Sequence, residues 1–556
     1  MDYSECHKEQ IHNPEHIQSF GYLIGLDYKT RSIEFYSENL SEIFDIEEEE
    51  LLNTSFSHFY DVFYEIIESK IYSELTGKVD EGRKLIGEIT INRKKYHLTI
   101  FKHEKYLFIE IEQFTASVLK NVDIFHSIEN TKIFDDEISV WQDLTQNIFR
   151  ITQYDRVMVY QFLEDGSGKV IAETKNDNFD SYLNLYYPES DIPKQARELY
   201  LKSTKRIFSN IYSIPCKIIS ARQEKLDLTY SSFRAMSPIH AVYLKNAGVA
   251  SSFSISIIIK NKLWGLITCQ NVEVKHIDLY SRIQAGVFTI LATNSAELIN
   301  DKTRYKDNIK FEKELSALKS KFFVNQNKRK STETYTEKFN QLLESDGIAY
   351  FNNGIWTKIG NVPSDNIVEN ILDWCKTNVE NIFISDSFMK DFGEELNLDE
   401  NSAGVCICKL DSAKNQTIIW FRKEFQNKIS WAGKDEKHLE KINYYGEWRT
   451  AVSPRQSFDV FSENIKGKSL PWDKSSEEKI RKIKDLLEEY DEFINLNGDD
   501  LNPGTEITGN IDHLEEYVVK MQKLITGIKN LESNSEVYDA KKEELANLYR
   551  IMKKYS

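Results

Sequence analysis

The residues that could carry chemistry lie in short groups along the chain, and each group taken alone is a weak signal. Cys6 lies near the N-terminus, far from the other five cysteines. A thiolate at a chain end can act as a nucleophile, although an incidental cysteine is the simpler explanation of one residue. His7, His12 and His16 are too loosely spaced for a convincing metal site, and no cysteine pair supports them. We therefore expect no metal.

Two other motifs favour structural roles. Residues 166–169 read Gly-Ser-Gly-Lys, but they lack the spacing and the Ser- or Thr-led helix of a phosphate loop. We predict a hairpin turn there. Cys406 and Cys408 alternate along a predicted strand, so both sulfurs share one face, which favours the core over a metal site.

The composition disfavours several classes of protein. The chain has 556 residues and a net charge of -17, whereas nucleic acids and anionic membranes bind basic surfaces. No apolar run approaches the roughly 20 residues of a membrane span, and the acidic N-terminus lacks the pattern of a signal peptide. Six cysteines in so long a chain do not make a disulfide scaffold. We expect a cytoplasmic protein with three or four domains and neither nucleic acid nor membrane as a partner.

The periodicity of apolar residues predicts three α+β units joined by a long helix. The first covers residues 17–114, the second 121–270 and the third 334–497. Strands of the second unit are expected at 156–162, 252–259 and 263–269. Residues 276–318 contain no proline and one glycine, which predicts a single connecting helix.

Two segments of the C-terminal half have a further meaning. The polar stretch 427–472 is too long for an ordinary loop, so it is a candidate functional element. Apolar residues from Ile511 to Ile528 alternate at spacings of three and four. Such a short seam suits packing on another helix, for example in a homodimer.

Four longer strings, read together, point to a family. The first is CHKEQIHNP at 6–14, followed by Ile17, Gln18 and Gly21. The second is PESDIPKQAR at 188–197, and the third is SPIH at 237–240 with YLKN at 243–246 and GV at 248–249. The fourth comprises WAG at 431–433, PRQSF at 454–458 and GKSLPW at 467–472. In this order they resemble the photosensory part of the bacteriophytochromes.

The resemblance implies a PAS–GAF–PHY architecture of the α+β class. The expected parts are an N-terminal bilin-attachment segment at 1–16, PAS at 17–118, GAF at 119–300, PHY at 301–509 with a hairpin "tongue" at 427–472, and a helical tail at 510–556. In this family the segment before the PAS domain threads through a loop of the GAF domain, an exception to the rule of unknotted chains. Ile17 would lie in that crossing.

The same resemblance implies a linear tetrapyrrole, biliverdin, as cofactor. Cys6 would bond to its vinyl group. Phytochromes with more reduced bilins carry a cysteine at the position of Ile239, so the isoleucine supports biliverdin on Cys6. Arg206 and Arg234 stand where the family binds the propionates, which need basic partners.

Other pocket positions follow from the family pattern. The serines that donate hydroxyls are Ser237, Ser252 and Ser254, and the acceptors for the pyrrole nitrogens are the Asp191 carbonyl and His240. The aromatic wall around the twisting ring comprises Tyr160, Tyr187, Tyr200 and Tyr243. Gln270 stands where the family has a histidine that bonds the carbonyl of that ring, and an amide cannot change its protonation state.

The tongue carries the expected signalling residues. Arg455 would pair with Asp191 in the dark and give way to Ser457 after light. Trp431 belongs to the first arm, and Phe461 replaces a tryptophan that takes part in refolding of the tongue. The Phe461 departure predicts an altered or weakened switch.

The function implied is red/far-red photoreception, relayed through the tongue and the long helices to a protein partner. We expect no catalytic residue, because the roughly fifty residues after Gly509 cannot hold both a phosphoacceptor helix and an ATP domain. His513 lacks the flanking pattern of a phosphoacceptor. Two alternatives stay open, namely a light-regulated kinase activity in a separate protein or a missing output domain, and a bilin-binding module without productive photochemistry.

Overall fold

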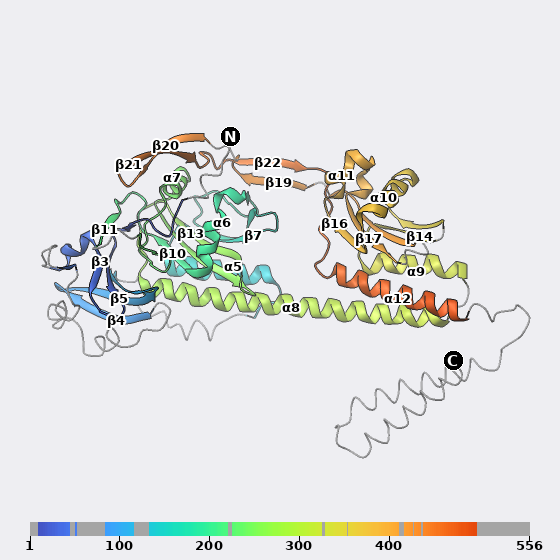
Figure 1. The fold of residues 1–556 in the computed structure, drawn as a ribbon, viewed down its shortest axis with the longest axis horizontal. Coiled ribbons are helices and arrows are strands. Elements are labelled where there is room, and N and C mark those ends of the chain that lie inside the picture. The colour runs from blue at the N-terminus through green and yellow to red at the C-terminus, as the bar shows by residue number, and fades with distance from the viewer. Residues whose placement is uncertain are drawn as a thin grey trace, which may run out of the picture.

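The computed structural model describes residues 9–44, 51–52, 84–115, 133–220, 225–324, 328–352, 354–410, 416–425, 427–434 and 438–497. Cys6 and the tail at 510–556, with its expected seam and His513, lie outside these residues. In Figure 1 three α+β lobes sit along one long helix, α8 (Leu279–Val324). This helix has 46 residues, so it is about 70 Å long and confirms the predicted connection.

The N-terminal lobe is a seven-stranded sheet with the order β1-β11-β3-β2-β6-β5-β4. Its strands are β1 (His16–Ile17), β2 (Gly21–Asp27), β3 (Ile33–Ser37), β4 (Lys84–Ile91), β5 (Lys94–His103), β6 (Tyr106–Gln113) and β11 (Cys216–Ser220), with a 3-10 turn η2 (Glu38–Glu42). Alternate residues of β6 enter different cores: Leu107 and Ile109 pack within the lobe, and Phe108 packs toward the central lobe. The sheet is therefore buried on both faces at this strand.

The N-terminal segment passes between the two arms of a loop from the central lobe. The carbonyl of Glu15 accepts from the Ile218 amide at 3.0 Å, on one arm, and the carbonyl of His16 accepts from the Ala235 amide at 3.1 Å, on the other. Ile17 is completely buried there. The structure thus places Ile17 inside the loop, where the resemblance puts the crossing.

The central lobe is built on an eight-stranded sheet with the order β10-β12-β13-β7-β8-β9-β19-β22. Its strands are β7 (Arg156–Phe162), β8 (Gly168–Lys175), β9 (Tyr186–Tyr187), β10 (Lys205–Phe208), β12 (Ser251–Ile259), β13 (Lys262–Asn271), β19 (Asn427–Ala432) and β22 (Val460–Ile465). The helices are α5 (Glu137–Thr152), α6 (Lys194–Lys202) and α7 (Pro238–Asn246), with a 3-10 turn η3 (Glu189–Asp191). The three predicted strands are confirmed, and so is the predicted hairpin turn, which covers residues 163–167, with Gly168 and Lys169 already in β8.

The third lobe is a five-stranded sheet with helices on both faces. Its elements are α9 (Lys328–Leu342), β14 (Gly347–Asn352), β15 (Ile355–Gly360), α10 (Asp365–Asn378), β16 (Ile382–Ser385), α11 (Phe388–Leu396), η4 (Glu400–Ser402), β17 (Gly404–Lys409), β18 (Thr417–Arg422) and α12 (Ser476–Asn497). Cys406 and Cys408 face the core shared with α8 and α12, while Val405 and Ile407 face α10 and α11. The predicted core role of the two cysteines is confirmed.

The segment 427–465 leaves the third lobe and reaches back over the central one (Figure 1). Its strands β19 and β22 pair with each other, and β19 also joins β9 through Trp431 and Tyr186. Beyond them, β20 (His438–Tyr444) and β21 (Glu447–Ser453) form a separate hairpin over α7. The expected hairpin tongue therefore has two ladders, and one of them extends the sheet of the central lobe.

No helix in the described part of the chain has the length and apolar character needed to cross a membrane.

A buried ion network joins the first lobe to the start of α8. Glu112 on β6 accepts from Arg282 on α8 and pairs with His276 Nε2 at 3.0 Å. His97 on β5 pairs with Asp278 at 2.9 Å, with both side chains buried. Two strands of the first lobe thus hold the first turn of the long helix.

The charge of Glu112 depends on its partners. Burial alone would raise the pKa of Glu112, but the Arg282 guanidinium and the His276 hydrogen bond outweigh burial and lower this pKa to about 2. Since the pKa is lower in the folded state than the ordinary value of 4.5, the network stabilises the fold above that pH. The stabilisation is lost as the pH falls from about 4.5 toward 2.

We predict that Glu112→Gln lowers the free energy of unfolding at neutral pH by about 3–5 kcal/mol, because Arg282 stays charged in a buried site. The matched control is Glu489→Gln, which breaks an exposed pair with Lys319 and should cost at most about 1 kcal/mol. Equilibrium denaturation at neutral and acid pH measures both, and the effect of Glu112→Gln should shrink with acidification. Equal losses for the two variants would contradict a buried network.

Candidate functional site

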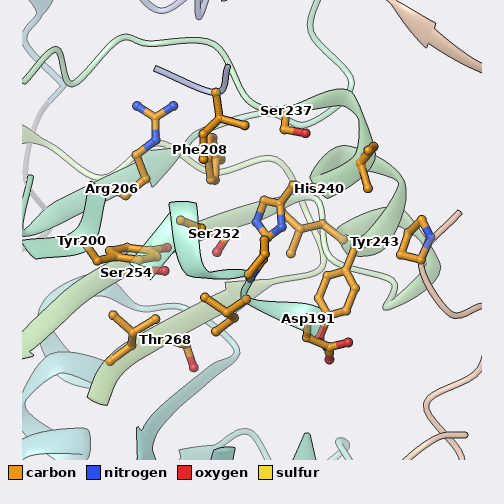
Figure 2. Close-up of a pocket in the computed structure, with 18 of the residues that line it drawn as sticks. Asp191, Tyr200, Arg206, Phe208, Ser237, His240, Tyr243, Ser252, Ser254 and Thr268 are labelled. Carbon is orange, nitrogen blue, oxygen red and sulfur yellow. Dashed lines mark hydrogen bonds between the residues drawn. The ribbon is translucent and has the colours of Figure 1, made fainter. Parts of the chain in front are cut away.

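A cavity of about 350 Å³ lies in the central lobe, between the sheet, the helices α6 and α7, and the end of β21. Figure 2 shows side chains from these elements converging on it. Its floor comes from neighbouring strands: Ser252 and Ser254 on β12 stand opposite Gln270 and Thr268 on β13. Alternate residues of a strand share one face, so this spacing directs these side chains into the cavity.

One end of the cavity is basic. Arg206 on β10 and Arg234, in the loop of the central lobe that surrounds the N-terminal segment, both line this end and are buried. The Arg206 guanidinium donates to the carbonyls of Arg234 and Ala235, the latter at 3.1 Å, and Arg234 donates to the Thr229 carbonyl at 3.2 Å. Among the described residues, no carboxylate lies within ion-pair distance of either guanidinium, and Arg234 Nε has no partner.

Keeping both buried guanidiniums charged, with no anion in ion-pair contact among the described residues, costs free energy. Burial, together with the neighbouring Arg234, lowers the pKa of Arg206, and burial lowers the pKa of Arg234 to about 10. Removing a charge from water is expensive unless an opposite charge compensates it. This end of the cavity is therefore suited to a ligand that carries anionic groups.

His240 on α7 lies near the middle of the cavity (Figure 2). The centroid of its ring lies 5.6 Å from that of the Phe208 ring and 5.8 Å from that of the Tyr243 ring. Burial and the charge of Arg206 lower the pKa of His240 to about 4, so the imidazole is neutral at physiological pH. A neutral imidazole has one donor and one acceptor nitrogen to offer a ligand.

The four predicted tyrosines, Tyr160, Tyr187, Tyr200 and Tyr243, all line the cavity. Tyr200 lies on the side of Arg206, whereas Tyr243 lies beside Asp191 on the other side (Figure 2). The rings of Tyr160 and Tyr187 meet edge-to-face at 5.7 Å. Burial raises the pKa of both hydroxyls, so they are neutral donors. The buried hydroxyls of Tyr160 and Thr268 have no hydrogen-bond partner in the described chain, which leaves polar contacts for a ligand.

The tongue closes the cavity through an ion pair. Arg455 contacts Asp191, and their side chains are only 1% and 9% exposed. The hydroxyl of Tyr243 donates to the same Asp191 oxygen at 3.1 Å, and the Arg455 guanidinium lies 4.9 Å from the ring of Phe458. The Asn246 amide also donates to the Arg455 carbonyl at 3.2 Å. Asp191 and Arg455, 264 positions apart, are thus brought together as the resemblance implies.

Three of the expected signalling residues lie outside the cavity lining. The Ser457 hydroxyl donates a hydrogen bond to the Asp459 carboxylate at 2.9 Å. Ser457 lies two positions after Arg455 in the chain. Trp431 and Phe461 face each other across the β19–β22 ladder. The Trp431 ring packs 5.9 Å from the ring of Tyr186, between centroids, and Lys434 lies over the ring of Phe461, so neither side chain lines the cavity.

The N-terminal segment also enters the site. Cys6 itself lies outside the described residues, but Glu9 and Ile11 line the cavity. Glu9 accepts a hydrogen bond from Ser237 at 2.8 Å, and burial raises the pKa of Glu9. Glu9 follows Cys6 by three positions in the sequence.

Sequence reasoning missed several lining residues. Glu9 is inside the attachment string but received no role, and Thr268 could have been found from its alternation with Leu266 and Gln270. Phe208 lies two residues after Arg206 on β10, so the same rule places it in the cavity.

Outside the cavity, His103, Glu104 and Asp227 bring possible metal ligands within 4.8 Å of one another. His103 already pairs with Asp227 at 3.1 Å, and Glu104 is exposed. This ion pair accounts for their proximity.

Comparison with known proteins places this cavity in a family. The PAS fold matches residues 6–114, the GAF domain 136–297 and the phytochrome region 316–492. Cyanobacterial phytochrome B of Nostoc sp. (strain PCC 7120) is 28% identical over 99% of this chain and 75% of its own length. A bacteriophytochrome of Pseudomonas aeruginosa is 27% identical over 87% of this chain and 66% of its own. The chain belongs to the phytochrome family.

Solved structures agree with this assignment. The photosensory core module of the Stigmatella aurantiaca phytochrome has a TM-score of 0.74 at 25% identity and covers 88% of this chain. A bacteriophytochrome of R. palustris, with a TM-score of 0.75 at 23% identity, supports the fold alone. This phytochrome is thus a photosensory module of the α+β class with PAS, GAF and PHY domains, as the sequence predicts. The domain boundaries expected from the sequence stay predictions.

Proposed function

We propose that this phytochrome is a red/far-red photoreceptor that carries biliverdin, bound covalently through Cys6. The observation that supports this most is the pair of buried guanidiniums, Arg206 and Arg234, which have no carboxylate partner among the described residues of an otherwise apolar, aromatic cavity. Two propionates would supply the two missing negative charges.

The rest of the cavity fits the same ligand. The orphaned hydroxyls of Tyr160 and Thr268 can donate to ring carbonyls, and Gln270 can donate through its amide. Neutral His240 can accept from a pyrrole nitrogen, as can the carbonyl of Asp191. Tyrosine rings give a flat wall beside which a ring can turn.

When bound, biliverdin supplies red-light absorption and a double bond that isomerises. The protein would hold the charged and polar ends still: Arg206 and Arg234 would bind the propionates, and His240 and the Asp191 carbonyl would bind the pyrrole nitrogens. Asp191 also holds Arg455, so a change around Tyr243 and Asp191 reaches the tongue. The tongue then changes its conformation, and α8 and the helices of the third lobe carry the change to a partner.

An absorbance spectrum after loading with biliverdin, recorded before and after red illumination, tests the proposal. A red band that converts reversibly to a far-red one supports photoreception. A red band that does not change would leave a bilin-binding module without photochemistry, and no band at all would contradict the ligand. Any kinase output would belong to a separate protein or to a further domain, and a phosphorylation assay with a candidate partner tests that alternative.

We predict that Arg234→Ala weakens biliverdin binding by about 10- to 100-fold, the factor expected for a lost charge-assisted hydrogen bond. Biliverdin dimethyl ester should bind the wild type weakly and should be nearly insensitive to the substitution, because it carries no propionate charge. Fluorescence titration of both ligands, with Cys6→Ser in every variant so that binding stays reversible, measures this. The exposed Arg93→Ala is the control, and an equal loss for acid and ester would contradict a propionate role.

We predict that Cys6→Ser still folds and binds biliverdin, because the hydrogen bonds of the cavity remain. The pigment should be released from the variant on denaturation and retained by the wild type, as zinc-induced fluorescence on a denaturing gel reports. Covalent pigment in the denatured variant would show that another cysteine forms the bond.

We predict that Arg455→Ala leaves dark pigment binding intact but shortens the lifetime or lowers the yield of the far-red-absorbing state. Asp191→Ala should have a larger effect, since it also disturbs the pyrrole acceptor. The double variant should match Asp191→Ala alone, because both substitutions remove one contact. Additive effects on the logarithm of the lifetime, measured by flash photolysis, would show that the two residues act separately.

We further propose a homodimer formed along α8. Ile290, Leu298, Tyr305 and Ile309 are each at least half exposed, at spacings of eight, seven and four that return to one helix face. Such an apolar stripe suits a second copy of the same helix.

We predict that Leu298→Asp converts the dimer to a monomer without changing the absorbance spectrum, because the residue is not part of the cavity lining. Light scattering after size-exclusion chromatography measures the mass. Asp301→Asn on the same helix is the control, and a dimer that survives Leu298→Asp would contradict the stripe.

A further inference from the structure

The tip of the β20–β21 hairpin touches the crossing between the N-terminal segment and the central lobe. The hydroxyl of Tyr445 donates to the Met236 carbonyl at 2.5 Å. Its ring stacks on His16 with a centroid distance of 4.5 Å and an angle of 23°. This contact is separate from the Asp191–Arg455 pair and lies at the other end of the hairpin.

The backbone of Tyr445 is strained. Tyr445 and Gly446 form the two-residue turn with φ of 53° and 108°. Turns with two left-handed residues favour asparagine, aspartate or glycine, and a bulky residue adopts this conformation at a cost. A tyrosine at the first position is therefore unfavourable for the turn alone, and its side-chain contacts must offset the strain.

The Met236 carbonyl belongs to a short segment on which three elements meet. Arg206 of the cavity donates to the carbonyls of Arg234 and Ala235, just before Met236. The Ala235 amide in turn donates to the carbonyl of His16, the residue on which Tyr445 stacks. Ser237, on the other side of Met236, donates to Glu9 in the cavity. A rearrangement at the basic end of the cavity thus reaches the anchor of Tyr445 through one or two residues.

We propose that Tyr445 is a latch that docks the tip of the tongue on the segment 234–236, and that it forms a second connection between cavity and tongue, independent of Arg455. It holds the hairpin in the conformation of this structure. The connection to light rests on the proposed function, whereas the docking itself does not.

Hydrogen exchange of the β20–β21 amides in the dark tests the docking, with and without biliverdin. Tyr445→Phe keeps the ring and loses the hydrogen bond, so protection of the hairpin should fall by about 2- to 10-fold, the factor for one net hydrogen bond. Tyr445→Asn should lose more protection, although asparagine suits the turn better than tyrosine. The control is Trp448→Phe on the same hairpin, whose side chain is 67% exposed. Unchanged or increased protection in Tyr445→Asn would overturn the latch, since that is the result for a residue that only forms the turn.

The second arm measures the same exchange after red illumination. Light should lower protection of the hairpin in the wild type, and the drop should be clearly smaller in Tyr445→Asn, where the tip is already released. Combined with Arg455→Ala, Tyr445→Phe should have an additive effect on the logarithm of the protection factor, and complete non-additivity would overturn the independence of the two connections. A wild type without any spectral response to light would count against the proposed function, while the dark comparison would still decide the docking.

Discussion

The buried ion pair between Asp191 and Arg455 is the contact on which the arrangement of the lobes depends. It joins the tongue to the central lobe, which the third lobe also contacts through the pairing of β19 with β9 and through α8. With exposures of 1% and 9%, neither side chain could stay charged there alone, and breaking such a pair costs about 3–5 kcal/mol. The tongue must therefore either cover the cavity or move far enough for both charges to reach water. A partly opened arrangement, in which one of the two charges stays buried alone, is therefore unfavourable.

Helix α7 supports this ion pair from two sides. The Tyr243 hydroxyl contacts the Asp191 carboxylate from the cavity side, and the backbone of Arg455 is held by Asn246. Both Tyr243 and Asn246 belong to α7, which also carries His240. One short helix therefore contacts the ligand site, the acidic partner and the tongue. At its start, the segment 234–236 connects the basic end of the cavity to the tip of the hairpin.

The main strands, the long helix and most cavity residues could be predicted from the sequence, because each depends on a pattern within a short stretch of chain. The strands β7, β12 and β13 and the helix α8 follow from apolar periodicity, and Cys406 and Cys408 follow from alternation along one strand. The cavity residues were found because short strings kept both residue type and order, from 188–197 to 454–458. Apart from the Asp191–Arg455 pair and the crossing at Ile17, which the resemblance implies, the contacts between distant segments were not predicted. Periodicity gives no sign that β19 continues the sheet of the central lobe through β9, or that Tyr445 stacks on His16.

Two substitutions singled out in the sequence have different surroundings. Phe461 stands opposite Trp431 in the register of the β19–β22 ladder, and its side chain is partly exposed, with Lys434 over its ring. Gln270 lines the cavity opposite Ser252, where its amide can donate but cannot titrate. Phe461 therefore lies outside the cavity, whereas Gln270 lines it.

A crystal structure of the dark protein loaded with biliverdin tests the central claim most directly, because the claim is about which charges meet in the cavity. We expect the propionates within hydrogen-bond distance of Arg206 and Arg234, with Asp191 and Arg455 still paired above the ligand. Propionates that point to solvent, with both arginines still bonded only to backbone carbonyls, would contradict the account.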